Sequence, residues 1–95
     1  MYNKDSNINF ENFTEVIVDE IIEDLFKVPS LGVCKCEKCT LDIKAIALNR
    51  LPPKYVVTEK GELYAKLDTF RNQIRVDVLK AVIEAVEIVK KNPSH

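Results

Sequence analysis

Several features that catalytic and membrane proteins depend on are absent from this 95-residue sequence. It has two glycines, one histidine and no apolar run long enough to cross a membrane. With so few glycines it has no glycine-rich loop to hold phosphates, and no Ser/His/Asp set or carboxylate pair marks a catalytic site. The opening MYNKDSNINF lacks the apolar segment of a signal peptide. We therefore expect a cytoplasmic protein that is not an enzyme and has no membrane partner.

Cysteine is scarce as well, and all three cysteines, Cys34, Cys36 and Cys39, lie within CKCEKC. A disulfide framework would use an even number at wider spacing, and cytoplasmic thiols stay reduced. C-x-C-x-x-C in a turn before a helix suits a tetrahedral zinc site, because a turn can bring successive sulfurs together. His95, water or a residue of a second subunit could be the fourth ligand. A redox switch and incidental clustering are the two other interpretations.

The formal net charge is only −1, which gives no reason to expect direct nucleic-acid binding. The distribution is uneven, however, with a balance of −6 over residues 1–26 and +4 over residues 27–60. The middle third is thus the part we expect to face an anion. Such asymmetry also arises when one charged face simply packs beside another.

The length and the 46% hydrophobic content predict a single domain over residues 1–95, with residues 1–8 as a flexible N-terminal arm. Apolar residues at three- and four-residue steps predict helices from about Asn9 to Lys27, over 40–51, and from Thr69 to Lys91. The first and last helices are apolar over most of their girth. We expect them to meet across the two-fold axis of a homodimer, the alternative being a monomeric three-helix core.

A β-hairpin is expected between the second and third helices. Tyr55–Val57 would pair with Leu63–Tyr64 across the loop Glu59–Gly61, although ELYAKL could instead open the last helix. The predicted fold class is therefore mainly α: a small helical domain of three main helices with a short β-hairpin before the long C-terminal helix.

The segment ALNRLPPKYV contains a rigid corner at Pro52–Pro53, flanked by Asn49, Arg50, Lys54 and Tyr55. Cations beside an aromatic ring can hold a phosphate and stack on a base. Alternatively, Arg50 and Lys54 only pair with the acidic first helix, and Tyr55 only begins a strand.

The cysteine motif followed by DIKAIALNRLPPKYVVTEKGELY and a long apolar helix resembles the late competence development protein ComFB family. The resemblance covers roughly Phe13 to Asn92. Its strongest part is the motif A-L-N-x-[LV]-x-P-x-Y, matched by Ala47, Leu48, Asn49, Leu51, Pro53 and Tyr55.

The resemblance implies a small, helical, dimeric and non-enzymatic protein. In Bacillus-type members the same three cysteines look like zinc ligands, with a fourth cysteine near the C-terminus. This chain ends in His95 instead, which is also a good zinc donor.

Cyanobacterial-type members resemble receptors for cyclic dinucleotides that act in motility and competence. This suggests a receptor for c-di-GMP or c-di-AMP acting on an unknown downstream protein. Its ligand would be held by Asn49, Arg50, Lys54, Tyr55, Lys60 and Arg71. The alternative is a zinc-stapled interaction module in DNA uptake that binds no small molecule.

Overall fold

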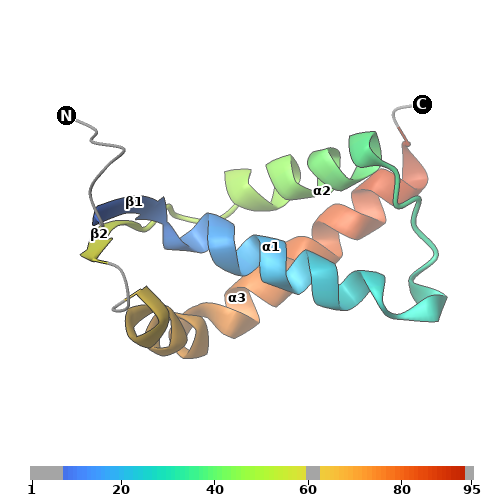
Figure 1. The fold of residues 1–95 in the computed structure, drawn as a ribbon. Helices are drawn as coiled ribbons and strands as arrows, with labels where there is room; N and C mark the ends of the chain where they lie inside the picture. The colour runs from blue at the N-terminus through green and yellow to red at the C-terminus, as the bar shows by residue number, and fades with distance from the viewer. Residues whose placement is uncertain (1–7, 60–62, 94–95) are drawn as a thin grey trace.

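The fold is given by a computed structural model that describes residues 8–59 and 63–93. The elements follow in the order β1 (Ile8–Asn12), α1 (Phe13–Phe26), the 3-10 turn η1 (Pro29–Leu31), α2 (Glu37–Asn49), β2 (Tyr55–Glu59) and α3 (Leu63–Lys91) (Figure 1). The predicted fold class, mainly α with three main helices, is confirmed. A homodimer and the single-domain boundary remain predictions, and the arm expected over residues 1–8 lies outside the described residues except for Ile8, which begins β1.

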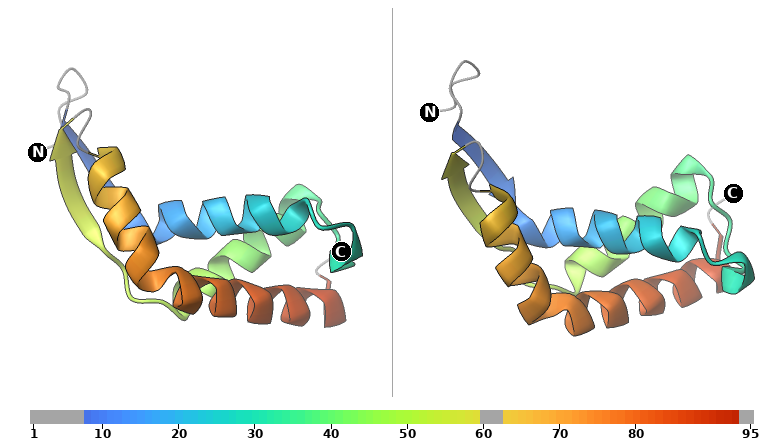
Figure 2. Two further views of the ribbon diagram at one scale, coloured as in Figure 1. Left: turned by 90° about the horizontal axis from the view of Figure 1, so that it is seen from below. Right: turned by 60° about the horizontal axis from the view of Figure 1, so that its bottom comes forward.

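The core lies where α1 and α2 pack on the C-terminal part of α3. Each helix contributes the apolar stripe that its sequence period predicts. Figure 2 shows that the first turns of α3 lie beside the two strands, while the rest of the helix runs along α1 and α2. Core side chains with no exposed surface include Ile17, Val18, Ile43, Val78, Val82 and Ala85.

The two strands form an antiparallel sheet in which Phe10 lies opposite Val57 and Asn12 lies opposite Tyr55. The strand beginning at Tyr55 is therefore confirmed, but the expected pairing with Leu63–Tyr64 is wrong, because those residues begin α3. The alternative, that ELYAKL opens the last helix, is correct.

Two helix starts also differ from the prediction. The first helix begins at Phe13 rather than near Asn9, because Asn12 takes an extended conformation and its side chain caps α1. The second begins at Glu37 rather than 40, because Cys36 takes the N-cap position in place of Thr40. Among the residues that the structure describes, none of the helices has the length and apolarity needed to cross a membrane.

Candidate metal centre and ligand cleft

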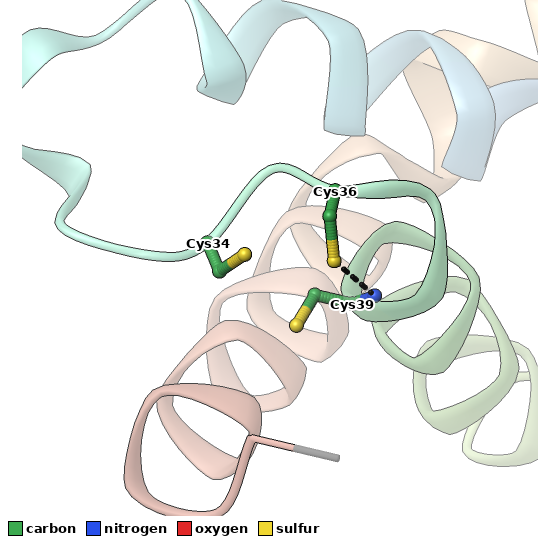
Figure 3. Close-up of side chains that lie close together, drawn as sticks. All are labelled: Cys34, Cys36 and Cys39. Carbon is green, nitrogen blue, oxygen red and sulfur yellow. Dashed lines mark hydrogen bonds between the residues drawn. The ribbon is translucent and has the colours of Figure 1, made fainter. Parts of the chain in front are cut away.

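The three cysteine side chains converge at the N-terminus of α2 (Figure 3). Their sulfur atoms all lie within 4.8 Å of one another. Cys34 and Cys36 are exposed, whereas Cys39 has no exposed surface and belongs to the core. The group is thus open to solvent on one side and anchored in the packed interior on the other.

Local backbone geometry explains why the loop bends the thiols together. Gly32 follows η1 with φ 72°, a left-handed conformation that favours glycine and turns the chain back toward α2. Lys35 donates a hydrogen bond from Nζ to the carbonyl of Phe26, which ties the loop to the end of α1. Cys36 is then placed as the N-cap of α2, and its Sγ accepts a hydrogen bond from the N–H of Cys39 at 3.4 Å.

The thiols differ in acidity because their surroundings differ. The hydrogen bond from the Cys39 N–H, followed by one from the Cys34 side chain, lowers the pKa of Cys36. Burial, with hydrogen bonds to Cys36 and Cys34, raises the pKa of Cys39 to about 11. Of these two thiols, Cys36 is therefore the one that loses its proton more readily.

The donor set fits zinc. Four tetrahedral ligands at about 2.3 Å from zinc place sulfur atoms about 3.8 Å apart, so sulfurs already within 4.8 Å need only a small closure. The N–H of Cys39 also satisfies a lone pair of the Cys36 sulfur. The end of α3 lies beside the cysteines (Figures 1 and 3), and His95 follows it in the sequence but lies outside the described residues.

A second feature is the proline corner, defined here as Leu51–Tyr55. Hydrogen bonds connect it to the start of α1. The hydroxyl of Thr14 donates to the carbonyl of Pro52 at 2.8 Å, and the N–H of Phe13 donates to the carbonyl of Lys54 at 2.8 Å. Oδ1 of Asn12 accepts from the N–H of Lys54 at 2.9 Å. The corner is therefore rigid through tertiary hydrogen bonds as well as through its prolines.

Two cavities, of about 340 and 140 Å3, flank this corner where it faces α3. Leu51, Pro52 and Asp77 line both, so the two cavities are adjacent, and together they are called here the corner cleft. The larger cavity is charged and the smaller is mainly apolar. Arg50, Lys80, Ala81 and Glu84 complete the larger cavity, and Thr14, Pro53, Lys54, Phe70 and Ile74 the smaller.

The structure brings only some of the expected ligand residues together. Arg50 and Lys54 line the corner cleft, one in each cavity. Asn49, the last residue of α2, and Tyr55 line neither, and Tyr55 stacks on Phe10 with ring centroids 5.4 Å apart. Lys60 lies outside the described residues.

Arg71 lies away from the corner cleft and faces α1. Its guanidinium donates to both carboxylate oxygens of Glu20, at 2.9 and 2.7 Å, and also to Asp68. These two partners raise the pKa of Arg71. The Arg71 side chain thus links α3 to α1. A phosphate would have to compete with Glu20 for the guanidinium.

The alternative interpretation of the corner is only partly correct. Tyr55 does begin β2, but Arg50 pairs with Glu84 of α3 rather than with α1. The acidic residues Glu15 and Asp19 of α1 pair instead with Lys44 of α2.

None of the six α3 residues that line the corner cleft was predicted as a ligand residue: Phe70, Ile74, Asp77, Lys80, Ala81 and Glu84. Phe70 and Ile74 matched the apolar stripe of a core helix, and Asp77 and Lys80 matched its polar face. No local motif distinguishes them from other helix residues. Only the packing of α3 against the corner makes them part of a cleft.

Comparison with known proteins gives a consistent result over nearly the whole chain. The family model described as late competence development protein ComFB matches residues 11–93. The competence protein ComFB of Bacillus subtilis (strain 168) is 26% identical over 83 residues, which cover 87% of this chain and 84% of that protein. The solved structure of the late competence protein ComFB from Bacillus subtilis has a TM-score of 0.71 at 26% identity, covering 90% of this chain and 93% of that one.

Proposed function

The chain belongs to the late competence development protein ComFB family, and we propose that it is a non-enzymatic, cytoplasmic regulatory protein of competence whose fold is held by a structural zinc ion. The observation that carries the zinc proposal is the convergence of three thiols within 4.8 Å at the junction of the loop and α2. Cys34, Cys36 and Cys39 would supply three ligands and His95 the fourth. A zinc ion there supplies a cross-link that small domains often need.

Metal analysis tests this proposal directly. Protein purified under reducing conditions should contain one zinc per chain, and removing it with a chelator should lower the midpoint of chemical unfolding. Cys39→Ser should abolish the metal content, whereas Glu37→Gln, which changes an exposed neighbour, should retain it. Metal-free protein of unchanged stability, whose thiols instead form a reversible disulfide with a mild oxidant, would favour the redox interpretation.

A second function is favoured by the corner cleft: reception of a cyclic dinucleotide, c-di-GMP or c-di-AMP. Lys54 and Lys80 offer cations to two phosphates, and Arg50 does so when a phosphate replaces Glu84 as its partner. An apolar wall beside them suits a base. Binding would alter the contacts of the protein with a downstream protein in competence or motility. A two-fold symmetric ligand also matches a two-fold symmetric protein.

The homodimer is part of this proposal. Val76 on α3 is 78% exposed, and Ile83, seven residues later on the same face, is 44% exposed. Apolar side chains left in solvent on one helical face are typical of surfaces that a second subunit covers. Light scattering coupled to gel filtration should give the mass of two chains, and Val76→Glu should shift the mass toward one chain.

Calorimetric titration with c-di-GMP and c-di-AMP, with linear pGpG as control, tests the receptor function. Saturable binding with a defined stoichiometry per dimer is expected, and charge reversal of Arg50 and Lys54 should abolish it. Lys91→Glu is the matched control, because Lys91 lines neither cavity. An absence of heat with both ligands, confirmed by a second assay, would leave a zinc-held interaction module without a small-molecule ligand.

A further inference from the structure

The junction of the corner cleft contains a carboxylate where a simple phosphate site would have only cations. Asp77 lines both cavities, between the apolar side and the charged side. Its side chain is exposed, and among the residues that the structure describes it makes no ion pair. A carboxylate repels phosphates, so in the proposed complex Asp77 would face another part of the ligand.

Asp77 contrasts with Glu84, the other acid of the cleft. Glu84 is paired with Arg50, so its charge is already compensated within the protein. Asp77 retains both oxygen atoms as acceptors for a ligand. The cleft therefore offers two adjacent acceptors in its middle and cations at Lys80 and Lys54, while Arg50 is paired with Glu84.

The wall beside Asp77 is apolar and fixed in shape. Phe70 contacts the buried Phe13, with ring centroids 5.9 Å apart, and Pro52 is held through its carbonyl by Thr14. A proline ring and a held aromatic ring give a preorganised surface for a flat heterocycle. The smaller cavity thus suits a base whose edge faces Asp77.

The bases differ in what they present to such a carboxylate. Guanine carries the N1–H and 2-amino donors side by side, and the two oxygens of a carboxylate can accept both. Adenine has an unprotonated N1 at the corresponding position. This nitrogen is an acceptor, so it repels a carboxylate oxygen, and that oxygen receives no hydrogen bond from the base. Sites that hydrogen-bond a donor discriminate strongly against ligands that lack it.

We propose that Asp77 makes the corner cleft selective for guanine, by accepting the N1–H and 2-amino hydrogen bonds of a base that lies on the wall of Phe70 and Pro52. This inference rests on the proposed receptor function, and it assigns c-di-GMP rather than c-di-AMP as the ligand. The phosphates of the ligand lie on the side of Arg50 and Lys80.

Calorimetry with three ligands tests the assignment on the metal-loaded protein. The wild type should bind c-di-GMP at least about tenfold more tightly than c-di-AMP. Cyclic di-inosine monophosphate keeps N1–H but lacks the 2-amino group, so its affinity should fall between the two. Asp77→Asn offers one acceptor and one donor, and an amide of this kind can hydrogen-bond to either guanine or adenine. The preference for c-di-GMP over c-di-AMP should therefore be lost.

The matched control is Glu87→Gln, which removes a carboxylate from α3 outside both cavities and should keep the wild-type preference. Because Asp77 is exposed, Asp77→Asn should unfold at the wild-type midpoint, and circular dichroism checks this. A preference that survives in Asp77→Asn, or a wild type that prefers c-di-AMP, overturns the inference and leaves the receptor function standing. A wild type that binds none of the three overturns both.

Discussion

The side-chain oxygen of Asn12 accepts a hydrogen bond from the backbone N–H of Lys54, 42 residues away in the sequence, at 2.9 Å. The same oxygen accepts from the N–H of Thr14 at 3.2 Å, as the N-cap of α1. One amide therefore both begins α1 and fixes the proline corner after α2. Asn12 also lies opposite Tyr55 in the sheet, so this side chain lies at the end of β1 and beside the start of β2.

Asn12→Ala should destabilise the protein by about 1–2 kcal/mol, because it removes an N-cap and leaves the Lys54 N–H without its acceptor. Chemical unfolding of the metal-loaded protein measures the change. Asn12→Asp keeps an acceptor at the same place and should recover most of the loss. Equal losses in the two variants would contradict a hydrogen-bonding role for the side chain.

Thr14→Val tests the second tie to the corner. Thr14 is only 1% exposed, and its hydroxyl donates to the carbonyl of Pro52. Valine keeps the shape but removes the donor, so we expect a loss of about 1–3 kcal/mol in unfolding free energy. Thr14→Ser, which keeps the hydroxyl, is the control and should lose less than valine does. The reverse order would show that packing, not the hydrogen bond, decides the identity of this residue.

The ion pair between Arg71 and Glu20 should contribute modestly to stability, because both side chains are partly exposed. A double-mutant cycle with Arg71→Met and Glu20→Gln should give a coupling energy of about 0.2–1 kcal/mol, decreasing as salt is added. Arg71→Met should leave dinucleotide affinity unchanged, because Arg71 lies outside the corner cleft. A large loss of affinity would restore Arg71 to the ligand site that the sequence predicted.

The helices were predictable because each buries one face. The buried positions therefore carry apolar residues that recur at helical spacing in the sequence. Ile17 and Val18 on α1 and Val78 and Val82 on α3 are all buried as their spacing indicates. Strand β1 was not predictable, because its partner β2 is remote in the sequence and Phe10 also continues the apolar spacing of α1. In the structure Phe10 is exposed and stacks on Tyr55, a contact that only the sheet creates.

The two candidate sites differ in the same way. The cysteines are neighbours in sequence, so a single turn can bring them together, and the motif alone indicated a metal site. The corner cleft is built from Arg50 and Pro52 on one side and Asp77 and Phe70 on the other. Pro52 and Pro53 marked the first side by their rigidity, but nothing in the sequence around Asp77 marks the second.

His95, the proposed fourth zinc ligand, gives the sharpest test of the proposed metal centre. His95→Ala should lower zinc affinity by about tenfold or more. Mutation of residues that only hydrogen-bond to a metal ligand commonly lowers metal affinity by that much, and a direct ligand should matter at least as much. Competition with a chromophoric chelator measures the affinity. Cobalt substitution should in parallel show a spectrum of three thiolates and one nitrogen in the wild type.

His95→Cys, which offers a fourth thiolate, should restore tight binding with an all-sulfur spectrum, and Ser94→Ala is the neighbouring control. If His95→Ala binds zinc and gives a cobalt spectrum like the wild type, then water or a second subunit supplies the fourth ligand. In the latter case, metal removal should also dissociate the dimer, because the ion would then bridge two chains. His95 as the ligand instead predicts a zinc affinity that is independent of protein concentration.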